Sequence, residues 1–590
     1  MSAKAPNVAR TVLGGWRDSR VLATAILVAV LGAVLATYWP ALSAGATYMD
    51  DKFYLGPPPM RDPSWASVKR IFGEMLHPSL VNGYYQPLAQ LSVMLDFLDP
   101  RAATSLLPFH RTTLVLHLGN VALVVVLLQL LFRNWTVAGL LGLLWGIHPL
   151  NADAVLWIAE RKTALSACFA LGSMVAYVAY AQHAGRTGRR DWKRYGVSLL
   201  LYLCALLAKP TALPLLALLL VLDYWPLDRL GRAAWLEKIP FLVVASLAAV
   251  VAVISQARAG DVGDVQVMNF LYVPQVMGYC IGLYLFKTVW PVALLSDYTG
   301  PKSYGLTHPE WMVYVLGATV AVVAVVLSAR RTRTWLAGGL FFVIAISPTL
   351  GIVRYTSSIA ANRSMYFPMV GMLLPLAWGF GRLWNMNIGA LRVPDVRMVL
   401  AGLVALLAIG SVRATRSYES HWRDSVVLLR YYLSQAPDDW KLHTRMGNEW
   451  IQRNEYPLAI SEFREASRLN PHWGENHLNL GRALFTVGEY PEARQSFAMA
   501  LERTPEDWRA HMLMGMTLSR LSDLEGALTE FRVAAQIAPR QAAAHYNVAN
   551  TLARLGRLDE AAGAYRKTLQ IEPRNVEALR ELASIETKHP

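Results

Sequence analysis

The chain has 590 residues, of which 54% are hydrophobic and 16% are charged, and its formal net charge is +15. This composition is too apolar for one soluble domain and the length is too great for a single core, so we expect at least two structural units. Because basic residues gather in short segments between apolar stretches, the charge indicates a membrane protein with basic cytoplasmic loops and argues against a nucleic-acid binder. Three cysteines lie within apolar runs, where we expect them to pack as small core residues: Cys168, Cys204 and Cys280.

A first membrane span is predicted from about Val21 to Tyr38. Basic residues precede it, and it ends at Trp39 and Pro40 without a clear small-residue cleavage site. We therefore interpret it as an uncleaved span and not as a signal peptide. The positive-inside rule then makes residues 1–20 a cytoplasmic tail.

Two adjacent acids, Asp50 and Asp51, follow the first span at the start of a long polar segment, residues 41–110. By alternation from a cytoplasmic amino terminus, this segment is an external loop. Paired acids flanked by aromatic residues at a membrane boundary suit a general base that deprotonates an acceptor hydroxyl beside a lipid headgroup. A solvated helix cap within an aromatic belt would place the same residue types here, so both interpretations stay open.

Further apolar stretches predict, with the first span, about eleven helices of roughly membrane-spanning length within residues 21–414. They lie near residues 112–132, 135–149, 164–182, 196–208, 211–227, 239–256, 311–328, 335–350, 364–382 and 397–413. The short basic loops 183–194 and 329–335 are predicted to be cytoplasmic. A full crossing of the membrane by the apolar stretch 269–290 would place the basic loop 329–335 outside the cytoplasm. We therefore predict that this stretch is re-entrant or lies at the outer surface.

Cationic residues are predicted on the same outer side as the two acids. They are Arg161 and Lys162 after the third span, Lys209 between two apolar runs, and Arg363 at the start of a late helix. A phosphate leaving group needs compensating charge, which Arg supplies through paired donors and Lys as a point charge. Cations that anchor helices at the membrane surface would produce the same pattern.

Histidines near the outer side have structural and functional interpretations. His148 precedes a proline, so it either binds sugar, moves protons or ends a helix. His110 and His117 share one helical face, which fits buried packing or the lining of an acceptor cavity. No two histidines in the sequence have a spacing typical of a metal site, so no metal site is predicted.

After the last span the sequence repeats every 34 residues. The repeating positions are prolines 437, 471, 505, 539 and 573, aromatic residues Phe463, Phe497, Phe531 and Tyr565, and small residues Gly447, Gly481, Gly515 and Ala549. This pattern predicts four tetratricopeptide repeats from about Trp440 to Asn575 with a capping helix, so that residues 440–590 form the domain. Residues 415–439 are predicted to contain a connecting helix, around Ser417 to Ser434.

The repeat domain is predicted to bind peptide on its concave side. Candidate contacts are Asn448, Arg482, Arg509, Tyr546 and Asn550, although an ordinary solvated face would look similar. Four histidines also recur at equivalent positions: His443, His477, His511 and His545. Because stacked repeats keep equivalent atoms about 10 Å apart, we expect a packed ladder in the core and not a metal site.

Several motifs together resemble the TMTC-type O-mannosyltransferases, multi-span enzymes of the GT-C class with carboxy-terminal tetratricopeptide repeats. The motifs are Asp50-Asp51, Tyr85-Gln86-Pro87-Leu88, His110 with His117, His148-Pro149-Leu150, Arg161-Lys162, Lys209-Pro210-Thr211, Asp223-Tyr224-Trp225-Pro226 and Asn362-Arg363-Ser364-Met365-Tyr366. The resemblance covers nearly the whole chain. The alanine- and arginine-rich composition suggests a bacterial-type member. Two positions depart from the family's pattern, with Gln86 in place of Arg and Thr163 in place of an acid.

The resemblance implies an all-α fold, a polytopic GT-C-like membrane helix bundle followed by a repeat solenoid. It implies inverting transfer of one sugar, mannose or a similar hexose, from a polyprenyl-phosphate donor to Ser or Thr of an exported protein held by the repeats. Asp50 or Asp51 would be the base. The donor phosphate would be bound by Arg161, Lys162, Lys209 and Arg363, and the candidate sugar or acceptor cavity includes Tyr85, His110, His148 and Tyr366.

Beyond the lipid-linked sugar, no cofactor is predicted, and a divalent-metal requirement stays open. The expected location is a bacterial inner membrane, with the active site and repeats on the periplasmic side. Two other functions fit the sequence. An oligosaccharide ligase or polymerase also combines many spans with repeats, but usually depends on a large late loop, whereas here the large loop comes first. A non-catalytic membrane scaffold would use the repeats alone.

Overall fold

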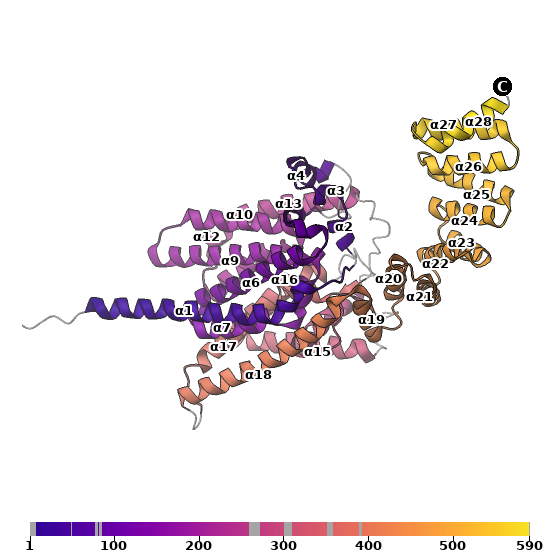
Figure 1. The fold of residues 1–590 in the computed structure, drawn as a ribbon. Helices are drawn as coiled ribbons and strands as arrows, with labels where there is room; N and C mark the ends of the chain where they lie inside the picture. The colour runs from indigo at the N-terminus through magenta and orange to yellow at the C-terminus, as the bar shows by residue number, and fades with distance from the viewer. Residues whose placement is uncertain are drawn as a thin grey trace, which may run out of the picture. The chain divides into compact units, whose positions relative to one another are not determined.

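The computed structural model describes residues 8–48, 50–76, 81, 85–258, 272–299, 309–350, 358–388 and 392–588. Within these ranges the chain is mainly helical, and its one sheet pairs two short antiparallel strands, β1 (Tyr298–Thr299) and β2 (Ser358–Ala360). The chain divides into two compact units, Met1–Ser425 and Val426–Pro590. The predicted all-α fold, a membrane helix bundle followed by a helical repeat array, is confirmed (Figure 1).

Apolar helices build the first unit. They are α1 (Val8–Tyr38), α6 (Leu107–Phe132), α7 (Trp135–Gly146), α9 (Arg161–Thr187), α10 (Trp192–Ala208), α11 (Leu215–Tyr224), α13 (Ile239–Arg258), α14 (Val273–Val289), α15 (Pro309–Ser328), α16 (Arg333–Ile346), α17 (Met369–Leu383) and α18 (Val393–Glu419). Short elements connect them: η4 (Pro149–Asn151), α8 (Ala152–Leu156), η5 (Ile158–Glu160), η6 (Pro210–Ala212), α12 (Arg232–Leu236), η8 (Ser347–Thr349) and η9 (Asn362–Met365). A helix lies within each apolar stretch predicted from the sequence.

Six segments in the described part of the chain are long and apolar enough to cross a membrane. They are Arg20–Ser43, Leu107–Phe132, Ile158–Thr187, Arg232–Ser255, Trp311–Ser328 and Val393–Arg423. The predicted count of about eleven also included shorter helices such as α7, whose 12 residues span less than the hydrocarbon core of a bilayer, about 30 Å thick. Large apolar side chains point outward, with Leu247, Leu316 and Leu406 between 63% and 70% exposed. Lipid covers such surface without the free-energy cost that it has in water, so this is a multi-pass membrane protein.

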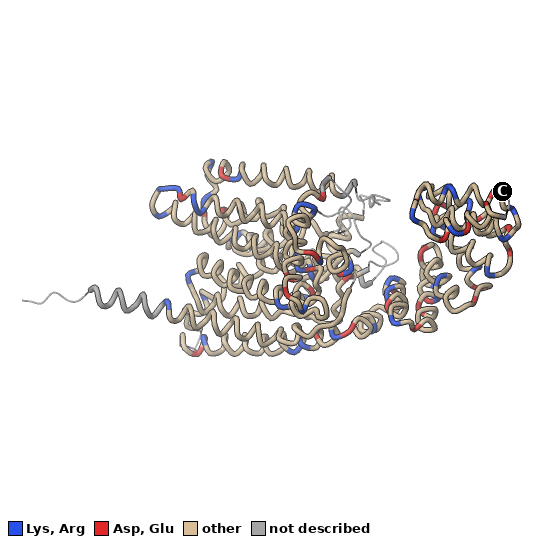
Figure 2. Tube along the Cα trace, turned by 45° about the horizontal axis from the view of Figure 1, so that its top comes forward, with Lys and Arg blue, Asp and Glu red and all other residues tan. Residues whose placement is uncertain are grey.

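The two predicted basic loops lie at one end of the bundle (Figure 2). Arg333, at the start of α16, forms an ion pair of 3.0 Å with Asp228. Arg190, between α9 and α10, lies 4.0 Å from Glu237. Because Asp228 and Glu237 both belong to the short segment between α11 and α13, both loops are held at the same end.

Helix α14 contacts the opposite end of the bundle. Cys280 Sγ donates to the Ile359 carbonyl at 3.2 Å, and His148 Nε2 lies 3.0 Å from the Thr288 carbonyl oxygen. The apolar stretch 269–290, predicted to be re-entrant or to lie at the outer surface, therefore contains a regular helix whose second half contacts the end opposite the basic loops.

The polar segment 41–110 is folded into short helices. These are η1 (Trp39–Ser43), α2 (Asp51–Leu55), α3 (Pro58–Arg61), α4 (Trp65–Phe72), η2 (Gly73–Leu76), α5 (Pro87–Asp96) and η3 (Pro100–Ala103). Its start lies against the end of α18, where the N–H groups of Gly45 and Ala46 donate to the Trp422 carbonyl at 3.2 and 3.0 Å. A Cβ on Gly45 would lie 2.7 Å from the Arg423 carbonyl oxygen, so this close approach requires glycine. These contacts fix the chain just before Asp50.

The connecting helix predicted around Ser417 to Ser434 corresponds to α19 (Ser425–Gln435), which begins later than expected. Helix α18 continues to Glu419, a 3-10 turn η10 (Ser420–Arg423) follows, and α19 begins afterwards. Asp424 separates them because its backbone is extended, with φ −155° and ψ 144°. A helix cannot pass through a residue in this conformation.

The second unit consists of helix pairs in a regular order. The pairs are α20 (Trp440–Gln452) with α21 (Tyr456–Leu469), α22 (Gly474–Val487) with α23 (Tyr490–Arg503), α24 (Trp508–Arg520) with α25 (Leu524–Ile537), and α26 (Ala542–Arg554) with α27 (Leu558–Ile571), followed by α28 (Val576–Lys588). Glycine allows the two helices of a repeat to meet. A Cβ on Gly481 would lie 2.6 Å from the Phe497 ring, and the equivalent distances are 2.6 Å for Gly447 and 2.7 Å for Gly515.

Replacing Gly481 by Val is expected to destabilise the repeat unit by about 1–3 kcal/mol, because the larger side chain overpacks the contact with Phe497. Thermal unfolding of the full-length protein in detergent measures the change. Gly563→Ala is the control, since no atom lies within 4 Å of its added Cβ. Alanine there should raise stability slightly through helix propensity, by about 0.5–1 kcal/mol. An unchanged melting temperature for Gly481→Val would contradict the packing explanation.

The four equally spaced histidines stabilise the junctions between repeats. In each case Nε2 lies near the carbonyl oxygen of the proline six residues earlier: 2.9 Å for His443, 3.0 Å for His477, 2.9 Å for His511 and 3.1 Å for His545. His477 and His545 are buried, as expected for a packed ladder. Each histidine therefore has two structural roles. It packs between helices, and its hydrogen bond fixes the turn that precedes the first helix of the repeat.

Candidate active site

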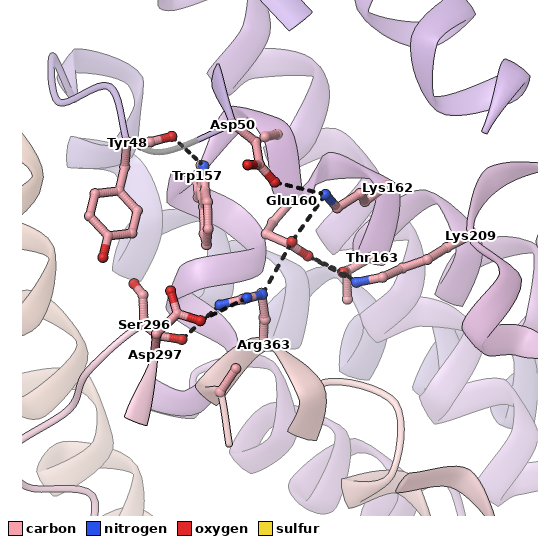
Figure 3. Close-up of polar contacts among 12 residues, drawn as sticks. Tyr48, Asp50, Trp157, Glu160, Lys162, Thr163, Lys209, Ser296, Asp297 and Arg363 are labelled. Atoms are coloured by element: carbon pink, nitrogen blue, oxygen red, sulfur yellow. Dashed lines mark hydrogen bonds and ion pairs between the residues drawn. The ribbon is translucent and has the colours of Figure 1, made fainter. Parts of the chain in front are cut away.

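Four of the predicted site residues meet at the end of the bundle opposite the basic loops (Figure 3). Asp50 precedes α2, Lys162 lies in the first turn of α9, Lys209 follows α10, and Arg363 lies in η9. Glu160, the last residue of η5, lies among them and is 2% exposed. We call Lys162, Lys209 and Arg363 the cationic cluster.

Glu160 contacts every member of the cationic cluster. Its Oε1 lies 3.4 Å from Lys162 Nζ and 3.2 Å from Arg363 Nε, and its Oε2 lies 3.1 Å from Lys209 Nζ. The Thr163 hydroxyl donates to Oε2 and accepts a hydrogen bond from Lys209 at 2.7 Å. A buried carboxylate is stable when it is paired, and three cations stay close together when an anion offsets their repulsion. Glu160 therefore organises the cluster.

The cationic cluster is partly open to the outside. The side chains of Lys162, Lys209 and Arg363 are 10%, 20% and 19% exposed, whereas that of Glu160 is 3% exposed. Each lysine ammonium has three N–H donors and the guanidinium has five. The cations therefore keep some exposed surface, and each has more N–H donors than Glu160 alone can accept from.

Arg363 owes its position to the pairing of β1 with β2, which brings the segment before η9 beside Asp297. Its guanidinium donates to Asp297 Oδ1 at 3.0 Å and to the Ser296 carbonyl at 2.7 Å, and Cζ lies 4.8 Å from the Trp157 ring centre. Burial alone would lower the pKa of Arg363, but Asp297 and Glu160 hold it above its ordinary value. The group is therefore a permanent positive charge.

The two adjacent acids have different surroundings. Asp51 is 1% exposed, and its two oxygens accept N–H groups of Tyr48 at 2.9 Å and Ala159 at 2.8 Å. Burial raises the pKa of Asp51 to about 7 in spite of these donors. The Asp50 side chain is 43% exposed, with Oδ2 3.5 Å from Lys162 Nζ. Asp50 is therefore the acid that is open to solvent, whereas Asp51 fixes the loop against η5 through the Ala159 N–H.

Arg161 does not join the cationic cluster, although it neighbours Lys162 in sequence. Its guanidinium forms an ion pair with Asp96 and donates to the carbonyls of Phe109 at 2.6 Å and Ser92 at 3.1 Å. Consecutive helical residues point about 100° apart, so the two side chains cannot face the same site. The predicted phosphate-binding role of Arg161 does not fit this placement. Its contacts instead hold α5 of the polar segment 41–110 against α6.

The two tyrosines of the predicted cavity do not lie together. Tyr366 is completely buried, and its hydroxyl contacts His117 Nδ1 at 2.7 Å and accepts from Asn120 Nδ2 at 2.9 Å. Tyr85 lies in the polar segment 41–110 and donates to the Phe72 carbonyl at 3.1 Å. The Tyr366 network joins helices in the bundle interior, so the proposed lining by Tyr366 is not seen.

The two remaining cavity candidates are also held inside the protein. His110 is completely buried. His148 Nδ1 accepts the N–H of Leu150 at 3.2 Å, Nε2 faces the Thr288 carbonyl, and burial lowers the pKa to about 4. This ring caps the start of η4, so its role is structural, although it begins a helical turn and does not end one. Across the described residues, no group of three His, Cys, Asp or Glu side chains is placed to hold a metal ion.

The sequence interpretation missed Glu160 and Asp297. An acid directly before the Arg161-Lys162 pair was a visible signal for Glu160, since a buried cation requires a partner. Asp297 gave no such signal, because its relation to Arg363 depends on a strand pair formed by distant segments. The two departures from the family pattern also have structural roles here. Thr163 bridges Glu160 and Lys209, and Gln86 accepts the Tyr54 hydroxyl at 3.3 Å.

The predicted peptide contacts on the repeats lie on the first helix of each pair. They are Asn448 on α20, Arg482 on α22, Arg509 on α24, and Tyr546 and Asn550 on α26. Arg509 is engaged within the array, where it forms an ion pair of 2.9 Å with Glu475. The Tyr546 ring packs against Tyr565, with 5.9 Å between the ring centres. Asn550 lines a hollow between α24 and α26.

Fold and site together define a class: a multi-pass membrane protein with a tetratricopeptide-repeat array and an acid beside a cationic cluster at one end of its bundle. Proteins named as protein O-mannosyl-transferases are similar to this chain in sequence. The chain is 23% identical to the protein O-mannosyl-transferase Tmtc1 of Drosophila melanogaster over 502 residues, covering 69% of this chain and 57% of that protein. It is 23% identical to human TMTC4, covering 66% of this chain and 58% of that protein. The predicted resemblance to TMTC-type O-mannosyltransferases is confirmed, and the chain spans less than two thirds of these relatives' length.

The repeat unit has relatives of its own. Family models of the tetratricopeptide repeat match residues 478–542 and 542–575. Among solved structures, the MamA protein is 18% identical, with a TM-score of 0.25, and the match covers 26% of this chain and 84% of that chain. The repeat assignment made from the 34-residue period agrees with the two family models over residues 478–575.

Proposed function

We propose that this protein is an inverting O-glycosyltransferase of the GT-C class. It moves a single sugar, mannose or a similar hexose, from a polyprenyl-phosphate carrier to Ser or Thr of an exported protein. The names of the similar proteins support transfer of mannose to protein. The observation that carries the proposal is the cationic cluster, because three partly open cations beside an exposed carboxylate suit a phosphate leaving group and an acceptor hydroxyl.

The reaction is one displacement. The acceptor oxygen attacks the anomeric carbon, its proton passes to Asp50, and the bond between that carbon and the phosphate oxygen breaks. The electron pair leaves with the polyprenyl phosphate. Lys162, Lys209 and Arg363 bind this phosphate and stabilise the charge that grows on it in the transition state. Inversion at the sugar follows because the acceptor attacks opposite the leaving group.

Lys162 couples the two halves of the site. Its Nζ lies between Asp50 at 3.5 Å and Glu160 at 3.4 Å. The ion pair helps to hold the Asp50 carboxylate in place beside the cationic cluster. The same ammonium lies next to the proposed phosphate position, so donor binding and the placement of the base depend on one residue.

The site is proposed to face the extracytoplasmic side, which is the periplasm in a bacterial inner membrane. Both basic loops lie at the other end of the bundle, and the positive-inside rule places such loops in the cytoplasm. The turn η10, which follows α18, contacts Gly45. From this chain order the repeats are also proposed to lie on the extracytoplasmic side. They are proposed to bind the acceptor protein.

Two alternatives make different demands on the site. An oligosaccharide ligase or polymerase would transfer a preassembled glycan and leave a much larger mass on its acceptor. A non-catalytic scaffold would not require Asp50 or the cationic cluster. The exposure of Asp50 beside Lys162 favours the transferase, since a scaffold has no use for this pair.

Mass spectrometry of exported proteins from cells with and without the gene tests the proposal. Hexose-sized additions on Ser or Thr should be lost on deletion, return with the wild-type gene and stay absent with Asp50→Asn. Larger additions that are lost on deletion would indicate the ligase. An unchanged exported proteome would contradict transfer to protein.

A further inference from the structure

The first helices of the third and fourth repeats, α24 and α26, line a hollow of about 150 Å³. Arg520 and Arg554 line it together with Asn547 and Asn550, and Phe485 and Met516 add apolar surface. The volume equals that of about five water molecules, which is enough for one small or medium side chain. The hollow is therefore large enough to select a residue of a bound peptide.

The arginines of this hollow lack the carboxylate partners that some arginines on the second helices have. Arg464 on α21 pairs with Glu492 at 2.6 Å, and Arg532 on α25 pairs with Glu560 of the next repeat at 3.1 Å. By contrast, no Asp or Glu lines the hollow. Within the described part of the chain, neither Arg520 nor Arg554 forms an ion pair. Arg554 donates to the hydroxyl of Ser519, which also lines the hollow. The hollow consequently has a surplus of positive charge.

The chemistry of the lining indicates its ligand. A guanidinium binds a carboxylate through two parallel hydrogen bonds, and two guanidinium groups around one small hollow favour an anion strongly. The amides of Asn547 and Asn550 can donate to and accept from the backbone of an extended chain. Phe485 and Met516 provide an apolar contact for a neighbouring side chain.

We propose that this hollow binds an Asp or Glu side chain of an extended acceptor segment, with an apolar residue of that segment against Phe485 and Met516. The inference rests on the proposed function, in which the repeats hold the acceptor. It names the class of acceptor: exported proteins whose extended segments carry acidic residues near the modified Ser or Thr. Among the predicted peptide contacts, Asn550 belongs to this site.

Binding of labelled peptides to the full-length protein in detergent, without sugar donor, tests the inference by fluorescence anisotropy. The probe is a short fluorescein-labelled peptide of repeating Val-Asp-Val-Thr units with an amidated carboxyl terminus. A matched peptide has Asn in place of every Asp, and a third has Asn and a free terminal carboxylate. We expect the acidic peptide to bind at least about 10-fold more tightly than both, since loss of one charge-assisted pair costs roughly a factor of 10 or more.

The double variant Arg520→Gln/Arg554→Gln should weaken binding of the acidic peptide by at least about 10-fold and leave the melting temperature unchanged. Arg494→Gln, an exposed arginine on α23, is the matched control and should bind as the wild type does. Failure of the acidic peptide to bind, equal binding of the Asn peptide, preference for the free terminal carboxylate, or unchanged binding by the double variant would each overturn the inference. Since no donor is present, these results are independent of whether the protein transfers sugar.

Discussion

Replacing Asp50 by Asn is expected to lower the turnover number by about 10²- to 10⁴-fold, which is the usual contribution of a general base. The amide cannot accept the proton of the acceptor hydroxyl. Because the Asp50 side chain is 43% exposed and contacts Lys162 at 3.5 Å, the substitution should leave folding and donor binding nearly unchanged. Transfer of labelled mannose from polyprenyl-phosphate mannose to protein, measured in membranes at saturating donor, gives the turnover number.

Asp51→Asn tests the other acid, and its expected effect is on stability. An amide cannot accept from the N–H groups of both Tyr48 and Ala159, so one buried donor is left unpaired at a cost of about 1–3 kcal/mol. The melting temperature should fall, while Asp62→Asn, an exposed residue of the same loop, should change neither property. An inactive Asp51→Asn of normal stability beside an active Asp50→Asn would reverse the two roles.

Glu160→Gln is expected to lower the stability of the donor-free protein by about 3–5 kcal/mol, the usual cost of removing one partner from a buried ionic group. Its three cations lie 3.1–3.4 Å from the carboxylate and would repel one another without it. A bound phosphate would then become their main anion. Polyprenyl phosphate should therefore raise the melting temperature of Glu160→Gln more than that of the wild type.

The control for this prediction is Glu74→Gln. Glu74, in η2 of the polar segment 41–110, is also a buried carboxylate. Unlike Glu160, it accepts a hydrogen bond from a neutral amide, that of Gln90, at 2.6 Å. It lies outside the cationic cluster, so polyprenyl phosphate should stabilise this variant and the wild type equally. A Glu160→Gln protein with wild-type stability and the same response to polyprenyl phosphate would show that Glu160 does not organise the cluster.

Those features that are local or periodic could be predicted from the sequence. Apolar length fixes where helices form in the bundle, because a helix buried in lipid needs a continuous run of apolar residues. The repeat array follows from its 34-residue period, since Gly481 and its equivalents must leave room for the aromatic ring of the same repeat. Four of the six residues predicted for catalysis and phosphate binding also meet in the structure: Asp50, Lys162, Lys209 and Arg363.

Tertiary structure alone decided the roles of neighbouring residues. Asp50 and Asp51 are equivalent in composition, yet one faces outward and the other accepts two backbone N–H groups. Arg161 and Lys162 diverge because consecutive residues of a helix point in different directions. Glu160 became the centre of the site only when three separate segments brought their cations to it. Such contacts depend on how distant segments pack and on how each helix is rotated about its axis. Residue type and spacing along the chain do not reveal either of these directly.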